Sequence, residues 1–122
     1  MKYVLGARCI RCGAEYEALP TITTCKCGGI LDIQYNYSAI RDHFSPADLS
    51  QCRDYSMWRY RPFLPVEEDS PAPPLRVGWS PLYRAQRLAG VLGLRELYIK
   101  DDGQNPTASL KDRASAMAVV KA

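Results

Sequence analysis

Hydrophobic and polar residues alternate near the N-terminus in a pattern typical of a β-strand. In the stretch ILDIQYNY at residues 30–37, the apolar side chains of Leu31, Ile33 and Tyr35 alternate with polar ones. Because successive side chains of a strand point to opposite faces, these three residues share one face of the strand. Together with the glycine-containing stretches before it, this strand predicts a small β module over residues 1–37.

Residues 38–76 have no sustained periodicity and contain many prolines. Within them, SPADLSQC predicts a short helix from about Pro46 to Cys52, with Ser45 as its N-cap and proline in its first turn. The rest of this region, which ends in PVEEDSPAPPLR, predicts an irregular, extended linker.

A helical pattern of apolar residues begins in residues 77–122. The apolar positions of PLYRAQRLAGVLGL fall on one stripe of a helix: Ala85, Leu88, Ala89 and Leu92. Gly93 ends this helix, RELYIK supplies a short strand, and SLKDRASAMAVVKA forms a second helix. The order helix, strand, loop and helix is typical of the start of an α/β domain. Because the last helix reaches Ala122 without a stop signal, we expect the N-terminal piece of a longer protein.

Composition and charge restrict the class of protein only slightly. Sixteen basic and thirteen acidic residues give a net charge of +3, and they are scattered along the chain, so nucleic acid is not an expected partner. No stretch approaches the ~20 apolar residues of a membrane helix, and the N-terminus lacks the features of a signal peptide. We therefore expect a cytoplasmic protein, in which five cysteines do not form a disulfide framework.

Four of the cysteines form two closely spaced pairs, Cys9-x-x-Cys12 and Cys25-x-Cys27, and each pair is followed by glycine. Four thiolates on two short loops are the ligands of a structural zinc ion, and the glycines let the backbone turn around it. The sequence predicts a structural zinc ribbon, although the second pair is one residue shorter than usual. The alternative is a set of small buried side chains without metal. Cys52 stands alone, and no catalytic zinc is expected.

The stretch DDGQNPTASLKDRASA raises a second question, whether Lys111 is a functional amine. Asn105-Pro106 should interrupt the chain, and Ser109 can then cap a helix with Asp112 as its capping-box partner. Lys111 would lie in the first helical turn, where the positive end of the helix dipole favours a free amine. A free amine is what attack on an aldehyde requires. The alternative is an ordinary solvated lysine.

Three segments resemble one enzyme family. NPTASLKDRAS is similar to the lysine segment NPT[GA]SFKDR of the threonine synthases, which belong to the tryptophan-synthase-β-like, fold type II, pyridoxal phosphate enzymes. GWSPLYRAQRLAGVLGLRELYIKDDGQ resembles the segment that precedes it in the family. CIRCGAEY and CKCGGILDIQY are similar to a zinc-ribbon-like N-terminal extension of many bacterial and archaeal members. The chain departs from the family pattern at Ser80, Ala108 and Leu110, where threonine, glycine and phenylalanine are usual.

The resemblance implies a fold class and a set of site residues. The expected fold is α/β, with a small zinc-ribbon-like β module followed by the start of a fold type II cofactor-binding domain. Lys111 matches the lysine that forms a Schiff base with pyridoxal 5′-phosphate, and Asp112 and Arg113 match positions that hold loop and helix together. The other carried-over roles are cofactor binding for Asn105 and Ser109, substrate binding for Thr107 and Ser109, and metal binding for Cys9, Cys12, Cys25 and Cys27.

The reaction implied by the resemblance is that of a carbon–oxygen lyase of threonine biosynthesis, which converts O-phospho-L-homoserine and water to L-threonine and phosphate. A homodimer is expected for the full-length enzyme. The 122 residues alone are expected to be inactive, because the groups that grip the cofactor phosphate and face its pyridine nitrogen lie beyond residue 122 in this family. Two alternatives remain, a related lyase similar to cysteate synthase and a zinc-ribbon binding module without catalysis.

Overall fold

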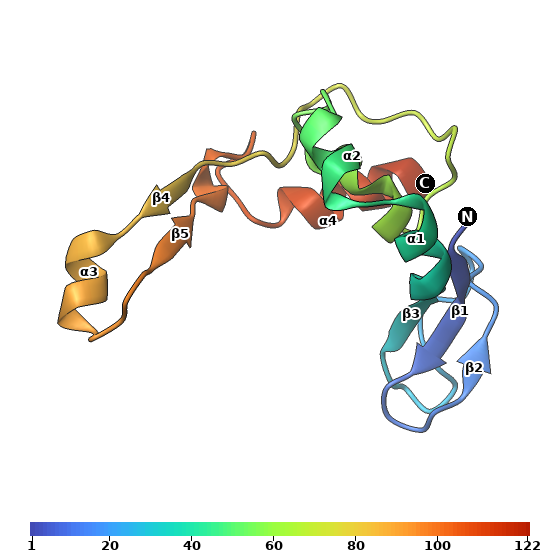
Figure 1. Cartoon of the computed structure of the whole chain (residues 1–122). Coiled ribbons are helices and arrows are strands. Elements are labelled where there is room, and N and C mark those ends of the chain that lie inside the picture. The colour runs from blue at the N-terminus through green and yellow to red at the C-terminus, as the bar shows by residue number, and fades with distance from the viewer. The chain divides into compact units, whose positions relative to one another are not determined.

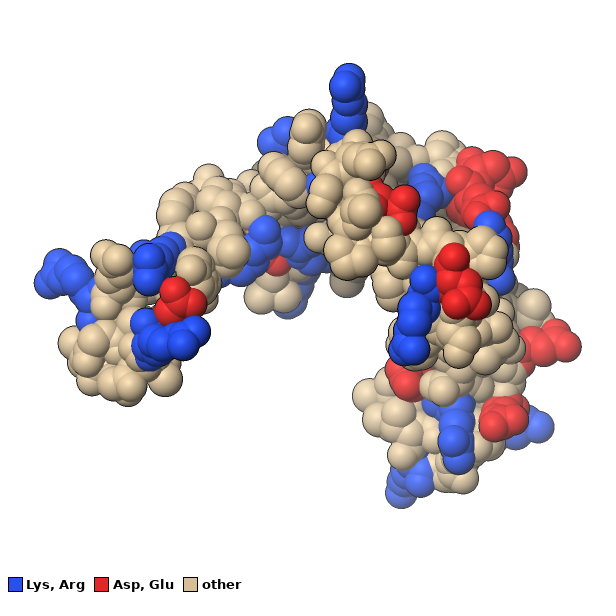
Figure 2. Space-filling model, in the orientation of Figure 1, with Lys and Arg blue, Asp and Glu red and all other residues tan.

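The computed structural model describes residues 1–122, which divide into two compact units. The first unit comprises Met1–Arg53, Arg59–Pro71 and Lys121, and the second comprises Asp54–Trp58, Ala72–Val120 and Ala122. None of the helices combines the length and the apolar character that crossing a membrane requires. On the face drawn in Figure 2, basic side chains lie dispersed among acidic ones and form no continuous patch.

A three-stranded antiparallel sheet forms the base of the first unit (Figure 1). Its strands are β1 (Val4–Cys9), β2 (Glu15–Tyr16) and β3 (Leu31–Tyr35), in the order β2-β1-β3. The strand predicted from the alternating pattern is confirmed as β3, in which Leu31, Ile33 and Tyr35 are partly covered while Asp32 is exposed.

Two helices follow β3 in the same unit. The first, α1 (Tyr37–His43), was not expected from the sequence, and its N-cap is Asn36, whose side chain accepts a hydrogen bond from the Ala39 amide. The second, α2 (Pro46–Gln51), confirms the predicted helix and its cap. Ser45 and Asp48 form a reciprocal capping box, with the Ser45 amide 2.7 Å from Asp48 Oδ2. Such caps satisfy amides that the first helical turn leaves unpaired.

The proline-rich region is less extended than predicted. A 3-10 helix, η1, occupies Met57–Phe63 and is kinked at Tyr60. Within η1, Arg61 donates to the backbone carbonyls of Glu67, Glu68 and Ser70 at 3.0, 3.2 and 2.7 Å and so holds the segment that follows. A single guanidinium with several donors can thus organise a segment that has no regular hydrogen bonding of its own.

The second unit contains a two-stranded antiparallel sheet and two α-helices. The strand β4 (Leu82–Arg84) pairs with β5 (Tyr98–Lys100), and α3 (Gln86–Val91) lies between them in the chain. A 3-10 helix, η2 (Asp102–Gln104), and α4 (Asp112–Lys121) follow. The helix, strand, loop and helix predicted from the sequence are all present, and β4 is an addition.

Helix α3 ends as predicted, but fewer of its apolar side chains are buried than predicted. Gly93 follows it with a φ of +66°, a left-handed conformation that suits glycine. Of the predicted apolar stripe, Ala89 is buried, whereas Leu88 and Leu92 are 45% and 57% exposed. The physical reason is that a sheet of two short strands offers little surface to cover a helix.

Candidate functional site

The four predicted zinc ligands come together in the first unit. The Sγ atoms of Cys9, Cys12, Cys25 and Cys27 all lie within 4.8 Å of one another. The Sγ distances are 3.6 Å for Cys9 to Cys27 and 3.5 Å for Cys12 to Cys25. A tetrahedron with zinc–sulfur bonds of about 2.3 Å has edges of about 3.8 Å, so the four thiols fit one such ion. The arrangement is compatible with a zinc ribbon, including the short Cys25-x-Cys27 pair.

Glycines shape the two loops that carry these thiols. Gly13 and Gly28 have φ values of +77° and +76°, and their amides donate to the Cys9 and Cys25 carbonyls at 3.0 and 2.8 Å. The positive φ of both glycines agrees with the turn expected after each pair. Gly29 has a different role, because a Cβ there would lie only 2.6 Å from Cys9 Sγ. The thiols can converge only because this position has no side chain.

Tyr16, on β2, is a polar neighbour of the thiols that the sequence analysis missed. Its hydroxyl lies 3.1 Å from Cys25 Sγ and accepts a hydrogen bond from the Lys26 amide at 3.2 Å. The Tyr16 hydrogen bond, aided by the Cys27 amide, lowers the pKa of the Cys25 thiol to about 6. Hydrogen bonding to Cys25 and then Cys12 raises the pKa of Cys27 to about 12. Cys52 lies outside the cluster, at the C-cap of α2.

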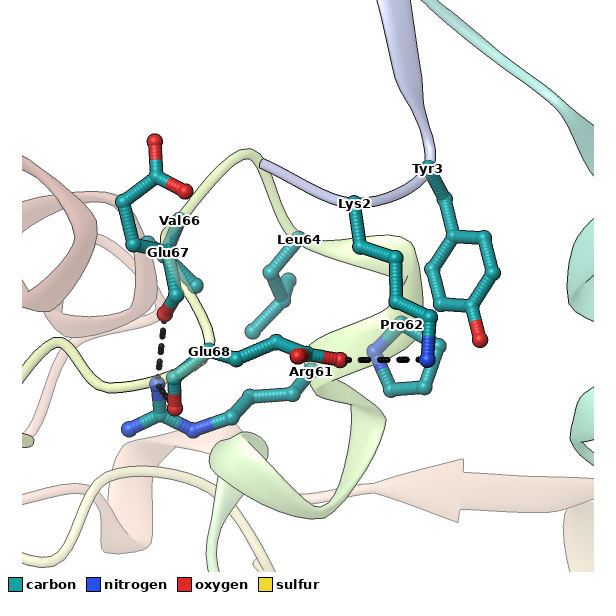
Figure 3. Close-up of a pocket in the computed structure, with 8 residues that line it drawn as sticks. All are labelled: Lys2, Tyr3, Arg61, Pro62, Leu64, Val66, Glu67 and Glu68. Atoms are coloured by element: carbon teal, nitrogen blue, oxygen red, sulfur yellow. Dashed lines mark hydrogen bonds and ion pairs between the residues drawn. The ribbon is translucent and has the colours of Figure 1, made fainter.

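A pocket of ≈ 280 Å³ in the first unit is lined by charged and apolar side chains (Figure 3). The lining residues are Lys2, Tyr3, Arg61, Pro62, Leu64, Val66, Glu67 and Glu68. Lys2 Nζ pairs with Glu68 at 3.5 Å, the N-terminal amine pairs with Glu67, and Arg61 bonds backbone carbonyls. Because these charged groups already bond one another or backbone carbonyls in the pocket wall, they do not indicate that the pocket binds a charged ligand.

The predicted lysine loop lies in the second unit, between η2 and α4. Asn105 is buried at the start of this loop, and its side chain makes three hydrogen bonds. Nδ2 donates to the carbonyls of Asp102 and Ser109 at 3.0 and 3.3 Å, and Oδ1 accepts from the Gly78 amide at 2.9 Å. Asn105 therefore ties both sides of the loop to the segment before β4.

The predicted capping box of Ser109 and Asp112 is wrong. Helix α4 begins at Asp112, and Lys111 occupies its N-cap position without a side-chain cap bond. The buried Asp112 carboxylate instead accepts from the Thr107 amide at 2.8 Å and from the Thr107 hydroxyl at 2.5 Å. Ala108, with a φ of +55°, turns the chain between them, so Asp112 reaches back past Ser109 to Thr107.

Lys111 is exposed and immediately precedes the first residue of α4, instead of lying in the first helical turn as expected. Its backbone amide donates to Ser109 Oγ at 3.2 Å, and its side-chain amine has no hydrogen-bond or ion-pair partner. The structure thus brings Asn105, Ser109 and Lys111 onto one loop, with Thr107 held to Asp112. The lysine amine is available to a ligand, and the groups around it are fixed.

A charged network lies beside the lysine loop in the same unit. Asp102 accepts two hydrogen bonds of 2.7 Å from Arg113 and one of 2.5 Å from the Ser80 hydroxyl. Lys100 donates to the Ser80 carbonyl. The Arg113 guanidinium, followed by the Ser80 hydroxyl, holds the pKa of the Asp102 carboxyl well below its ordinary value. The expectation that Arg113 ties loop and helix together agrees with these contacts.

Nearly the whole chain is similar to known threonine synthases and, less strongly, to a cysteate synthase. No protein-family model and no solved structure matches it. A threonine synthase of Methanocaldococcus jannaschii is 44% identical over 115 residues, which cover 94% of this chain and 28% of that protein. A threonine synthase of Methanosarcina acetivorans is 42% identical over 116 residues, with 94% and 27% covered. A cysteate synthase of Methanocella paludicola is 30% identical over 130 residues, with 97% and 27% covered.

The chain spans little more than a quarter of the length of these relatives. Within that span the two threonine synthases match it more strongly than the cysteate synthase does, at 42–44% against 30% identity. Across 94% of its residues, this chain is a homologue of the threonine synthases.

Proposed function

We propose that this chain is part of a pyridoxal phosphate-dependent lyase, a threonine synthase, that converts O-phospho-L-homoserine and water to L-threonine and phosphate. The threonine synthases among its relatives support this proposal. The observation that carries it is the exposed, unpartnered Lys111 amine at the start of α4, on a loop fixed by Asn105 and Asp112. A primary amine in this setting can bond covalently to an aldehyde.

Each residue of the loop has a role in this proposal. Lys111 would hold the cofactor, and its amine would move protons at the α and β carbons of the substrate. Ser109 and Asn105 contribute to cofactor binding. The hydrogen bonds that Asn105 makes within the loop also hold the loop's conformation. Thr107 and Ser109 meet the substrate. Pyridoxal 5′-phosphate, when bound, supplies an electron sink for the carbanions of the reaction.

The proposal extends to the organisation of the protein. Residues 1–37 form a zinc-ribbon-like module in which Cys9, Cys12, Cys25 and Cys27 hold one structural zinc ion. Residues 38–76 form a proline-rich linker with short helices, among them α2 and η1, and residues 77–122 form the beginning of a fold type II cofactor-binding domain. We expect the full-length enzyme to be a cytoplasmic homodimer and the 122 residues alone to form no threonine. The relatives are much longer than this chain, which supports the expectation that activity needs further parts of the enzyme.

A related lyase is the second candidate, because the cysteate synthase relative matches 97% of the chain at 30% identity. The product decides between the two. Full-length enzyme that makes threonine and free phosphate from O-phospho-L-homoserine supports the first proposal. Enzyme that makes no threonine from that substrate, but makes cysteate from a phosphorylated three-carbon amino acid and sulfite, supports the second.

The cofactor role of Lys111 is tested by borohydride reduction of the full-length protein after incubation with pyridoxal phosphate, followed by peptide mapping. We expect the adduct on Lys111 and its loss in Lys111→Ala, with kcat reduced on the order of 1,000-fold or more. Lys121→Ala, at the exposed far end of α4, is the matched control and should keep both the adduct and the activity. An adduct on another lysine, or none, would contradict the proposal.

A further inference from the structure

Asp102 joins three segments of the second unit that are separate in the chain. Its carboxylate bonds Arg113 in a two-point fork, from Nε to Oδ2 and from Nη2 to Oδ1, both at 2.7 Å. The Ser80 hydroxyl donates to Oδ1 at 2.5 Å. Ser80 precedes β4, Asp102 lies in η2, and Arg113 lies in the first turn of α4. A fork of this kind fixes orientation as well as distance.

The surroundings of the fork keep it partly shielded from water. The side chains of Arg113 and Asp102 are 33% and 22% exposed, and Ser80 is buried. Gly78 leaves space beside the guanidinium, because a Cβ there would lie 3.0 Å from Arg113 Nη1 and 2.8 Å from the Met57 amide nitrogen. A shielded two-point pair resists solvent competition better than an exposed single contact does.

The fork lies next to the proposed cofactor lysine in the chain. Lys111 is two residues before Arg113, and Asn105 bonds the Asp102 carbonyl at the other end of the loop. Because Arg113 belongs to the first turn of α4, holding its guanidinium restricts rotation of that turn about the helix axis. The direction in which Lys111 leaves the helix is then restricted as well.

We propose that Asp102 is a positioning residue, which clamps Arg113 and Ser80 and thereby sets the direction and reach of the Lys111 amine. This inference depends on the proposed function of Lys111. It assigns no direct contact between Asp102 and substrate or cofactor. A misplacement of about 1 Å at a reacting group can lower a rate by about 100-fold, so a clamp of this kind can have a large effect on the reaction.

The test uses the full-length enzyme with Asp102→Asn, Arg113→Lys and the double variant. Two rates are measured, the attachment of pyridoxal phosphate to Lys111, trapped with borohydride and mapped, and kcat with O-phospho-L-homoserine. We expect each single variant to lower both rates by about 10- to 100-fold while KM changes less than about twofold. Because both changes remove the same clamp, the double variant should be no slower than the slower single variant.

The matched control is Glu96→Gln. It removes the negative charge from the single contact of 3.1 Å between Arg84 and Glu96, whose side chains are 52% and 44% exposed in the same unit. Both rates should stay within about twofold of wild type, as expected for an exposed ion pair. Equal losses in this control and in Asp102→Asn would overturn the inference, since any broken ion pair would then have the same effect.

The remaining outcomes separate the inference from the proposed function. If Asp102→Asn attaches the cofactor as fast as wild type, or if the losses of the two variants multiply, Asp102 is not a clamp, and the role of Lys111 stands. If wild type attaches no cofactor at Lys111, both fail. Should Asp102→Asn not fold, Ser80→Ala removes one hydrogen bond from the same carboxylate, and an attachment rate equal to wild type in that variant overturns the inference.

Discussion

The thiol cluster predicts that replacing Gly29 with alanine weakens zinc binding. The added Cβ would lie 2.6 Å from Cys9 Sγ, 2.9 Å from Arg11 Cβ and 3.2 Å from Cys27 Sγ. Two of these three atoms are proposed metal ligands. The methyl group therefore cannot be accommodated by moving the free end of a flexible side chain, as it could at most surface positions.

The size of the effect follows from these distances. Non-bonded carbon contacts are comfortable at about 3.5–4.0 Å, so Cys9 Sγ must move by roughly 1 Å. A zinc site tolerates deviations of about 0.2 Å in its metal–ligand distances. Overpacking of this kind costs about 1–3 kcal/mol. If the whole cost falls on the metal-bound form, zinc affinity decreases by about 5- to 150-fold.

The assay is a competition for zinc between the protein and a chromophoric chelator at neutral pH. The control is Gly90→Ala on α3, which adds the same methyl group where nothing lies within 4 Å. Its zinc affinity should equal that of wild type. If Gly29→Ala binds zinc as tightly as wild type, the geometry described for the cluster is wrong. If wild type binds no zinc, the metal-free alternative for these cysteines is correct.

Two further predictions concern hydrogen bonds of the first unit. In metal-free protein, Tyr16→Phe should raise the pKa of Cys25 from about 6 towards its ordinary value, because it removes the main hydrogen bond to the thiolate. In wild type the ionised thiolate stabilises the fold at alkaline pH, and this contribution is lost as the pH falls through about 6, so the variant should lose it at higher pH. Thiolate absorbance against pH measures the midpoint, and an unchanged midpoint would contradict the assignment. Ser45→Ala should lower the free energy of unfolding by about 1 kcal/mol in denaturant titrations, whereas Ser50→Ala on the exposed face of the same helix should change it by less than about 0.5 kcal/mol; equal effects would contradict the role of the cap.

The features that the sequence predicted well depend on local chemistry. Ser45, followed by proline and then by Asp48, specifies a helix start, and α2 begins at Pro46 with both capping-box bonds. Gly93 ends α3 because only a residue that tolerates a positive φ fits there. In each case the interacting groups lie within about four residues of one another, so the spacing in the chain determines the contact.

The features that the sequence did not predict depend on contacts between segments. Tyr16 meets Cys25 because β1 and β2 pair, and no spacing rule links a tyrosine to a cysteine nine positions later. Ser109 and Asp112 have capping-box spacing, yet Asp112 bonds Thr107 because Ala108 turns the chain. The strand β4 is three residues long, too short to show periodicity, and its pairing with β5 defines it.

The three strands of the N-terminal sheet have a consequence for the order of synthesis. All three, together with the four clustered cysteines, lie between Val4 and Tyr35. Contacts within so short a stretch close quickly, and N-terminal segments emerge first from the ribosome. The thiol cluster can therefore assemble while the segment that contains Lys111 is still being translated. Zinc that is available during translation can then bind the thiols before the segment that contains Lys111 is complete.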